Sequence, residues 1–243
     1  MIGNLILKIL MIIINIIDFG NKSKVINYFK AKFKNQTVNV FDIGAHKGET
    51  IDIFLKNLNI KSIYSFEPNY KLFKLLEQNK KYKSNKIKLF NIGFGEISEI
   101  KELNIFKDTS SSTLNYINEN TQYFKRKKRF MSFFFKDQNF LTEKQRVQIS
   151  NLSEFISENS IDKIDVLKID TEGYEYNILK GLKKSDFKKI KYLYFEHHYD
   201  LMIKKKYKYS DIKKILENEN FKKKLKIRMK FRKSFEYIYE NCN

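Results

Sequence analysis

Charged side chains gather at the end of an apolar segment in the middle of the chain, Ile164–Gly173. If the apolar part of this segment is a buried strand, its alternation puts Lys168 and Asp170 on one face, and Asp170 and Glu172 flank the strand end. Buried strands do not normally end in several charges, and acids and bases in such a place are typical of a catalytic centre. A structural ion pair followed by a helix-starting glutamate would explain the same residues without catalysis.

A second group of proton-accepting residues ends another apolar run. Glu196, His197 and His198 stand at the end of the run that starts at Ile190, and they offer one carboxylate and two imidazoles. These are side chains that often accept or donate a proton during catalysis. We expect one of the three to be a candidate base and at least one to be structural.

A glycine turn follows the β-rich run Val38–Ile43. Gly44 places no Cβ where a ligand would approach the backbone, and Gly48 permits close packing of the strand on the following helix. Taken alone, this turn is equally typical of any strand-to-helix connection. His46 stands where the middle glycine of a dinucleotide turn belongs, which leaves less room for a pyrophosphate.

Glu67 closes the next predicted strand about 20 residues after Gly48, the spacing at which an acidic residue accepts hydrogen bonds from the ribose hydroxyls of a bound nucleoside. S-adenosylmethionine contains a ribose but no phosphate. The short glycine turn and Glu67 together therefore favour S-adenosylmethionine over NAD as the cofactor.

The elements that position these residues alternate between strand and helix, which predicts an α/β fold with a mainly parallel sheet. A helix over Ser23–Asn35 precedes them. The spacing predicts strands at Val38–Ile43, Ile63–Phe66, Ile87–Ile92, Ile164–Ile169 and Ile190–Glu196, helices at Thr50–Leu58, Tyr70–Asn79, Leu152–Glu158, Tyr174–Leu182 and Asp211–Asn218 (capped by Ser210), and a closing antiparallel pair at Leu225–Phe231 and Phe235–Tyr239.

Composition excludes several classes of site. Cys242 is the only cysteine and there are 3 histidines, so disulfides, cysteine-held zinc and iron–sulfur clusters are excluded. The formal charge is +20, and such a charge can serve nucleic-acid binding. Because the basic residues are overwhelmingly lysines spread along the chain, we interpret most of them as solvated surface.

The first 19 residues differ from the rest, because Ile2–Ile17 contains a single charge, Lys8. As a helix this run is shorter than the hydrocarbon core of a bilayer, about 30 Å, and Asn4, Lys8 and Asn15 fall on one stripe. Three interpretations stay open: a helix in a membrane interface, a helix docked on the domain or a partner, and a short span. We divide the chain into a helical segment, 1–36, and a catalytic domain, 37–243.

Within the domain, residues 97–145 look long, irregular and rich in phenylalanine, and we interpret them as an insertion over the acceptor site. The basic run Phe124–Phe130 lies in this region, with five consecutive cations between aromatic residues. It is a candidate platform for phosphates and bases, and equally a solvated loop near an acidic glycan or membrane.

Six short strings occur in order along roughly residues 38–200: Asp42-Ile43-Gly44-Ala45-x-x-Gly48, Phe66-Glu67-Pro68, Asn91-Ile92-Gly93, Ser111-Ser112, Ile164-Asp165-x-Leu167-Lys168-Ile169-Asp170-x-Glu172-Gly173-x-Glu175 and Phe195-Glu196-x-His198. Together they resemble the FkbM-type methyltransferases, which use S-adenosylmethionine to methylate hydroxyl groups of sugars and other natural products. Where that family often has Asn, this chain has His46, which alters contacts to the methionine end of the cofactor.

The resemblance implies a class I methyltransferase fold, Rossmann-like, with a mostly parallel seven-stranded sheet, an antiparallel closing strand and N-terminal helices. It also implies site residues. The expected cofactor-binding residues are Asp42, Gly44, Ala45, His46, Gly48, Glu67, Pro68 and Asn91, and the expected substrate-binding residues are Ser111, Ser112 and Glu172.

Methyl transfer to a hydroxyl requires a group that takes its proton. We expect Asp170 to be this base, with Glu196 and His198 as the next candidates, and Lys168 to orient the acceptor or keep Asp170 ionised. Alternatively, Asp170 and Glu172 hold a divalent cation, so metal dependence stays open.

The expected function is O-methylation of a sugar, glycan or related hydroxyl compound. The alternatives are a ribose 2′-O RNA methyltransferase and a non-catalytic nucleotide-binding module. A carbohydrate or small-molecule acceptor is favoured over nucleic acid as partner. The expected location is cytoplasmic, with membrane contact through residues 1–19 as an option.

Overall fold

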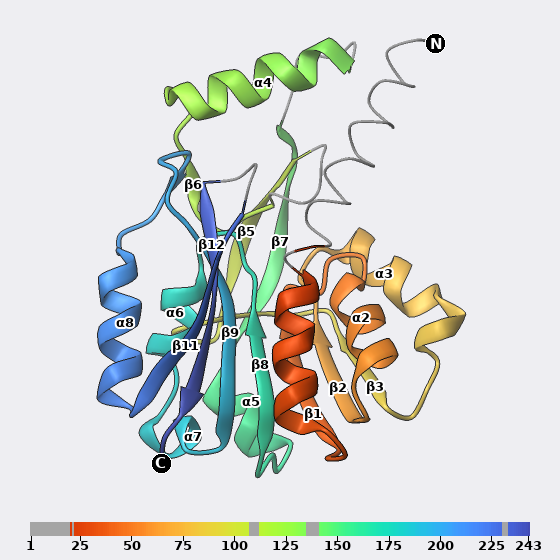
Figure 1. The fold of residues 1–243 in the computed structure, drawn as a ribbon. Coiled ribbons are helices and arrows are strands. Elements are labelled where there is room, and N and C mark those ends of the chain that lie inside the picture. Colours follow the sequence, from red (N-terminus) through yellow and green to blue (C-terminus); the bar gives the residue numbers. More distant parts are fainter. Residues whose placement is uncertain (1–19, 21, 107–111, 135–140, 230–232) are drawn as a thin grey trace.

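A seven-stranded sheet forms the centre of the protein in the computed structural model, which describes residues 20, 22–106, 112–134, 141–229 and 233–243 (Figure 1). The strand order is β11-β12-β9-β8-β1-β2-β3. The strands are β1 (Val38–Ile43), β2 (Ile60–Phe66), β3 (Ile87–Phe90), β8 (Ile164–Ile169), β9 (Ile190–His198), β11 (Phe221–Arg228) and β12 (Ser234–Asn241).

The pairings confirm the predicted class I methyltransferase architecture. β3, β2, β1, β8 and β9 pair in parallel, whereas β12 runs antiparallel between β9 and β11. The helices are α2 (Glu49–Asn57), α3 (Tyr70–Gln78), α4 (Gln122–Phe134), α5 (Leu152–Glu158), α6 (Glu175–Lys180), α7 (Lys184–Phe187) and α8 (Tyr209–Asn218), with the 3₁₀ turn η1 (Lys80–Tyr82).

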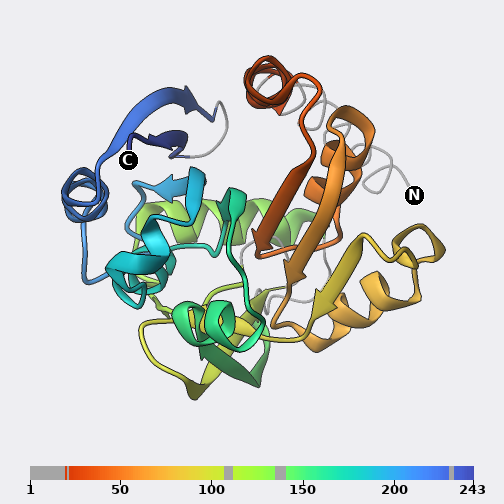
Figure 2. The ribbon, with the colours of Figure 1, turned by 90° about the horizontal axis from the view of Figure 1, so that it is seen from below.

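Helices cover both faces of the sheet (Figure 2). One face packs on α5, α6 and α8 through buried residues such as Leu167 and Ile178. The other packs on α2 and on the helical residues 22–33, whose Phe29 and Phe33 lie against Tyr192 of β9. Because both faces are covered, β8 is buried along its whole length, as expected for a central parallel strand.

Most predicted element boundaries agree with the structure to within a few residues, and Ile164–Ile169 and Leu152–Glu158 agree at both ends. The predicted Ser210 cap is wrong, because α8 begins at Tyr209 with Lys208 as its N-cap. The Asp211 carboxylate accepts a hydrogen bond from the Lys208 backbone N–H at 2.7 Å, and the Asp211 N–H donates to the Lys208 carbonyl at 3.0 Å, so the helix starts at Tyr209.

Residues 97–145 are not irregular as expected. They contain β5 (Glu99–Phe106), which pairs antiparallel with β7 (Leu141–Asn151), and β4 (Gly93–Gly95) joins β7 on the other side. Alternate residues of β5 and β7 are apolar and form a small cluster of their own: Leu103, Ile105, Val147 and Ile149. The intervening charged residues hid this period of two from the sequence analysis.

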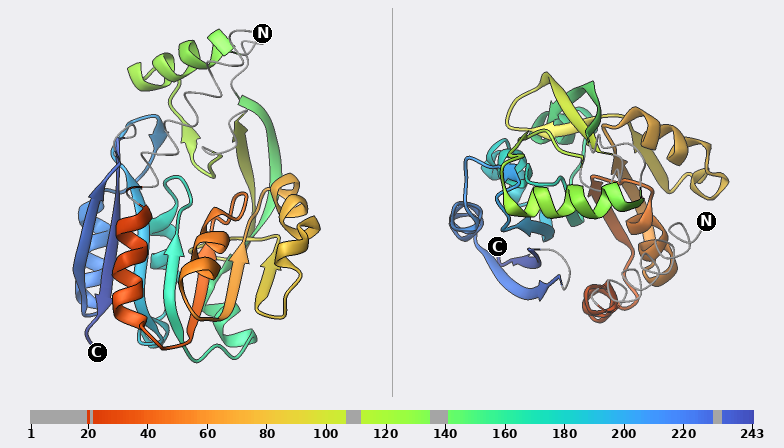
Figure 3. Two further views of the ribbon diagram at one scale, coloured as in Figure 1. Left: turned by 45° about the vertical axis from the view of Figure 1, so that its right-hand side comes forward. Right: turned by 90° about the horizontal axis from the view of Figure 1, so that it is seen from above.

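The long helix α4 lies across the carboxyl ends of the parallel strands (Figures 1 and 3). Its first turn is anchored by Phe124, which is buried with Phe106 of β5 and with Met202 and Ile203. Ile203 belongs to β10 (Ile203–Lys204), which pairs with β6 (Tyr116–Ile117). The connection that follows β9 therefore supports the helix above the site.

The apolar N-terminal run at residues 1–19 lies outside the described residues, so its three interpretations stay predictions. Within the described part of the chain, no helix is long and apolar enough to cross a membrane.

Candidate active site

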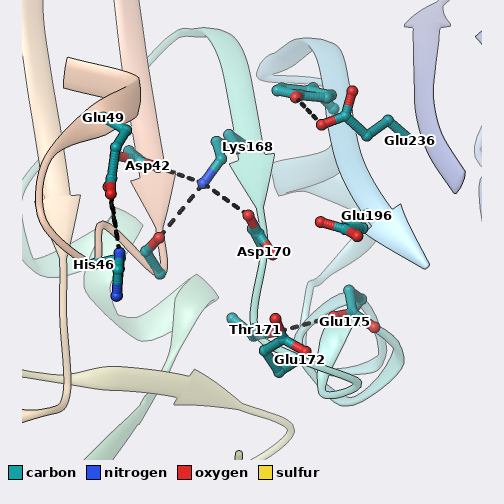
Figure 4. A network of polar contacts seen from close by, with 12 residues as sticks. Asp42, His46, Glu49, Lys168, Asp170, Thr171, Glu172, Glu175, Glu196 and Glu236 are labelled. Carbon is teal, nitrogen blue, oxygen red and sulfur yellow. Dashed lines mark hydrogen bonds and ion pairs between the residues drawn. The ribbon is translucent and has the colours of Figure 1, made fainter. Parts of the chain in front are cut away.

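The charged residues predicted from the sequence lie on one face of the sheet at the carboxyl ends of β1, β8 and β9 (Figure 4). Strand register explains the arrangement. Asp42 of β1 is opposite Lys168 of β8, and strand alternation places Asp170 and Glu196 on that same face.

Lys168 is the centre of the first group. Its ammonium lies 3.0 Å from Asp42 Oδ1 and 3.6 Å from Asp170 Oδ2. Burial lowers the pKa of Lys168, but the charges of Asp42 and Asp170 outweigh burial and raise that pKa above its usual value. Lys168 is therefore a fixed cation beside Asp170, whose side chain is 35% exposed.

Gly44 is required by the packing of two strand ends, and not by the approach of a ligand as expected. Its φ is +85°, and a Cβ here would lie 1.9 Å from the backbone oxygen of Asp170. The Asp170 N–H also donates to the Ile43 carbonyl at 3.0 Å. The glycine is thus required by the contact between the ends of β1 and β8, and that contact fixes the position of Asp170. Gly48 has φ +88° and packs on the Tyr82 side chain.

Glu67 is buried at the end of β2, with 7% of its surface exposed. One carboxylate oxygen accepts a hydrogen bond from the His46 N–H at 2.8 Å and the other from the Asn69 N–H at 2.9 Å. Burial raises the pKa of Glu67 to about 7 even though both backbone donors lower it. Each oxygen keeps a second lone pair that can accept a further hydrogen bond.

The other expected cofactor residues support this turn. The Ala45 N–H donates to the Phe66 carbonyl at 3.0 Å, and the Asn91 side chain donates to the carbonyls of Glu67 and Pro68 at 2.8 and 3.1 Å. Asn91 therefore braces the loop after β2.

His46 lies beside the first turn of α2. Its backbone is left-handed, with φ 50°, and its ring nitrogen lies 3.2 Å from Glu49 Oε1. Burial raises the pKa of Glu49, but the hydrogen bond and charge of His46 outweigh it and lower the pKa to about 2. The His46 ring is thus oriented by an anionic partner.

His198 ends β9 among carboxylates. Its Nε2 lies 3.2 Å from Glu172 Oε2 and 3.6 Å from Glu196 Oε1, and its Nδ1 lies 3.7 Å from Asp200 Oδ2. Burial lowers the pKa of His198, but Glu172 and Glu196, followed by Asp200 and Glu175, outweigh burial and raise it to about 10. An imidazole that is already protonated at neutral pH cannot accept a proton there.

His197, by contrast, faces the opposite side of the sheet, among the rings of Tyr199, Tyr207 and Tyr209. Burial and the neighbouring cations Lys205 and His198 lower the pKa of His197 to about 3. Its imidazole is neutral and structural.

Glu236 is a site residue that the sequence analysis missed. It lies on β12 directly opposite Glu196 of β9, and its carboxylate accepts a hydrogen bond from the Tyr194 hydroxyl at 2.8 Å. Burial, and then the charge of Glu196, raise the pKa of Glu236 to about 7. In the sequence, Glu236 could be recognised only as a glutamate in the predicted closing strand, at a position that alternates with Phe235 and Tyr237.

Of the expected substrate residues, Glu172 lies in the loop after β8. Ser111 lies outside the described residues, and Ser112 is half-buried. The next residue, Thr113, donates its hydroxyl hydrogen bond to the Glu172 carbonyl at 2.8 Å, and the Asn115 side chain donates to the Gly173 carbonyl at 2.7 Å. The segment from the insertion therefore holds Glu172 in place beside His198.

Glu175 clamps the same loop from α6. Its carboxylate accepts hydrogen bonds from the Gly173 N–H at 2.9 Å and from the Tyr207 hydroxyl at 2.7 Å. Within the residues that the structure describes, no group of three or more His, Cys, Asp or Glu side chains is arranged to hold a metal ion.

Comparisons with known proteins agree with this geometry. Residues 42–223 match the family model described as the methyltransferase FkbM domain. The crystal structure of methyltransferase FkbM from Methylobacillus flagellatus KT is similar with 16% identity and a TM-score of 0.52, over 84% of this chain and 44% of that one. This likeness shows the fold, and the chain spans less than half the length of that protein.

Two further solved structures are more distant. Magnesium protoporphyrin IX methyltransferase (ChlM) from Synechocystis PCC 6803 with bound SAM has 10% identity and a TM-score of 0.48, over 94% of this chain and 81% of that one. TrmK from M. capricolum in complex with S-adenosylhomocysteine has 12% identity and a TM-score of 0.47, over 86% of this chain and 64% of that one. No curated protein matched the chain.

Proposed function

The chain belongs to the FkbM methyltransferase family, whose model matches residues 42–223, and from this premise we propose that it transfers the methyl group of S-adenosylmethionine to a hydroxyl group of a sugar, glycan or related natural product. One observation carries the proposal. Glu67, which can accept hydrogen bonds from the ribose of a nucleoside, lies at the same edge of the sheet as the group of carboxylates around Asp170.

The ends of β1 and β2 fit a nucleoside cofactor. Glu67 is held by two backbone N–H groups, and its remaining lone pairs suit the two donors of a ribose diol. Asp42 Oδ2 is buried without a hydrogen-bond partner among the described residues, so this end of β1 keeps a further acceptor. When bound, S-adenosylmethionine supplies an electrophilic methyl group on a sulfonium sulfur.

On the acceptor side, Asp170 is the proposed base. It is accessible, it lies beside the ammonium of Lys168 at 3.6 Å, and its backbone is fixed to the end of β1. As the oxygen–methyl bond forms, the hydroxyl proton passes to the Asp170 carboxylate. Lys168 orients the Asp170 carboxylate through their ion pair, and protonated His198 holds Glu172 and Glu196 in place around the acceptor.

Two measurements test the function. Calorimetry should detect binding of S-adenosylmethionine and S-adenosylhomocysteine, and binding of NAD instead would overturn the cofactor. Transfer of a radiolabelled methyl group to a panel of oligosaccharides should occur with the native protein. Binding of S-adenosylmethionine without transfer to any hydroxyl compound would instead support a non-catalytic module.

A ribose 2′-O RNA methyltransferase is the second candidate, and the charge of α4 favours testing it. Lys125, Arg126 and Lys128 are exposed on this helix, which lies over the site. An RNA acceptor predicts transfer that falls steeply as salt rises and that is lost when these three residues are replaced by alanine. A neutral glycan acceptor predicts little dependence on either change.

A further inference from the structure

Among the residues that the structure describes, the two most exposed large hydrophobic side chains lie at the end of the molecule that carries α4. Tyr116 of β6 is 81% exposed, and Leu201, which precedes β10, is 76% exposed. β6 and β10 pair with each other beside α4 (Figures 1 and 3). The two side chains therefore project from neighbouring segments of one small substructure.

The backbone beside Leu201 is fixed by its neighbours. The Met202 N–H donates to Asp200 Oδ1 at 2.9 Å, and the Met202 carbonyl accepts from the Asn118 N–H at 2.7 Å. The Met202 side chain is buried with Phe124 of α4. Because the residues on both sides of Leu201 are anchored, the turn holds this apolar side chain toward solvent as part of the fold.

Cations surround the two hydrophobic side chains. Five of them are exposed on α4 and in or just after β10: Lys125, Arg126, Lys128, Lys204 and Lys206. Lys204 is directly opposite Tyr116 in the register of β6 and β10. Among the described residues, none of the five has a carboxylate within ion-pair distance, so their charges are available to a partner.

Acidic side chains are few in these segments. Residues 112–134 and 199–206 contain two of them, Glu119 and Asp200, and Asp200 is buried. Exposed apolar side chains among cations are complementary to a membrane surface that contains anionic lipids. The apolar groups enter the boundary between headgroups and acyl chains, while the cations meet the lipid phosphates.

A membrane fits this surface better than an RNA does. Both would use the cations, and RNA bases could stack on Tyr116, but only a bilayer has an apolar region for Leu201. We propose that Tyr116, Leu201 and the five cations form a surface that binds a membrane containing anionic lipids. Because the candidate active site lies beneath α4, its acceptor side would face the bilayer (Figure 3). Membrane binding of this kind goes beyond the proposed methyl transfer and does not depend on it.

The first test is sedimentation of the full-length protein with vesicles of phosphatidylcholine, alone or mixed in equal amounts with phosphatidylglycerol. The native protein should bind the anionic vesicles more tightly than the neutral ones. Replacing Lys125, Arg126 and Lys128 by glutamate should weaken binding to the anionic vesicles by roughly 100-fold or more. Binding as tight as that of the native protein would show that the proposal is wrong.

A control variant carries the same change of net charge elsewhere. Lys61, Lys184 and Lys188 are exposed near the amino ends of β2 and β9, at the opposite edge of the sheet from α4 (Figure 1). Replacing these three by glutamate should leave most of the binding to anionic vesicles. An equal loss in both variants would show that net charge alone attracts the protein, and it would overturn the proposed surface.

Fluorescence then places Leu201 at the membrane. The chain contains no tryptophan, so Leu201→Trp supplies a single fluorophore. With anionic vesicles its emission should move to shorter wavelengths and be quenched by brominated lipid. The control Ile97→Trp, at a position that is 60% exposed before β5, should show neither change. Sedimentation of Leu201→Trp with no change in its emission would mean that another part of the protein binds the vesicles.

A double variant separates a bilayer from an RNA. Tyr116→Ser with Leu201→Ser should weaken binding to anionic vesicles about tenfold or more, because both apolar contacts are lost. Ile97→Ser with Ile100→Ser, at two exposed positions near the start of β5, should not. Unchanged vesicle binding in the first variant would overturn the proposal, and tight, salt-sensitive binding of single-stranded RNA by the native protein would then assign the cations to RNA.

Discussion

The site has two halves, one at the ends of β1 and β2 and one at β9 and β12, and their polar atoms are held in different ways. On the side of β1 and β2, both oxygens of Glu67 accept backbone N–H groups. On the side of β9 and β12, side chains hold the polar atoms instead: His198 Nε2 lies 3.2 Å from Glu172 Oε2 and 3.6 Å from Glu196 Oε1, and Glu236 accepts a hydrogen bond from the Tyr194 hydroxyl. We infer that backbone groups hold Glu67 in the first half, whereas the second half depends on the charges of its side chains.

Lys168 and Asp170 lie at the border between these halves. The ammonium joins Asp42 of one strand to Asp170 of the next, and the Gly44 contact fixes the same two strand ends. Variants at this border, and on each side of it, therefore test whether the two halves are held differently.

The largest effect is expected for Asp170→Asn, which keeps the shape and removes the base. Turnover should fall by about 10²–10⁴, with nearly unchanged affinity for S-adenosylmethionine. The measurement is single-turnover methyl transfer beside calorimetry, and Asp162→Asn, at an exposed position, is the control. Normal turnover in Asp170→Asn with an inactive Glu196→Gln would move the base to β9.

Lys168→Met should destabilise the fold by about 3–5 kcal/mol, because it leaves the Asp42 carboxylate buried without its cation. Urea unfolding followed by circular dichroism measures this loss. The control Lys180→Met removes an exposed ion pair with Glu96 and should cost at most about 1 kcal/mol. Adding Asp42→Asn to Lys168→Met should recover part of the stability, and no recovery would argue against a charge effect.

The positions of most strands along the chain, and the clustering of Gly44, Gly48 and Glu67, could be predicted because their signals are local. Ile164–Ile169 is an apolar run interrupted only by Asp165 and Lys168. Gly44, Gly48 and Glu67 follow the ends of two strands that are successive in the sequence. The prediction that Lys168 and Asp170 share a face is confirmed, since strand alternation is sufficient to place them.

The second half could not be predicted in the same way. Glu236 meets Glu196 only because β12 runs antiparallel beside β9, a pairing that depends on how the whole sheet closes. The burial of Glu67 likewise depends on the His46 and Asn69 backbones around it. The β5–β7 pair was missed because its apolar residues alternate with charges over a long separation in sequence.

The free energy of unfolding should depend on pH through Glu236 in the second half of the site. The pKa of Glu236 is raised from 4.5 to about 7 by burial and Glu196, so the folded state keeps a proton that the unfolded chain releases at lower pH. This contribution to stability is fully present below pH 4.5 and is lost as pH rises toward 7. It amounts to at most roughly 3 kcal/mol.

Glu236→Gln should therefore remove this part of the fall in unfolding free energy between pH 4.5 and 6.5, below the range in which the contribution of His198 to stability begins to be lost. Glu67, whose pKa is also raised to about 7, and His197, whose pKa is lowered to about 3, change the stability in opposite directions over this range in both proteins, so the difference between the two curves reports Glu236. Urea unfolding at a series of pH values measures the two curves. Parallel curves for the native protein and the variant would show that Glu236 is ionised in the folded state.

The smallest effect is expected in the first half, where Glu67→Ala removes a carboxyl group that binds backbone and ligand alike. Loss of charged hydrogen bonds to a ribose, about 1.5–3 kcal/mol, should weaken S-adenosylmethionine binding by roughly 10–100-fold. The His46 and Asn69 N–H groups also lose their acceptor, so some thermal stability should be lost with it. Glu77→Ala, at an exposed position of α3, controls for the loss of charge. Because S-adenosylhomocysteine has the same ribose but no sulfonium charge, both ligands should weaken by the same factor. A loss confined to S-adenosylmethionine would indicate that Glu67 attracts the positive charge of the cofactor and does not bind its ribose.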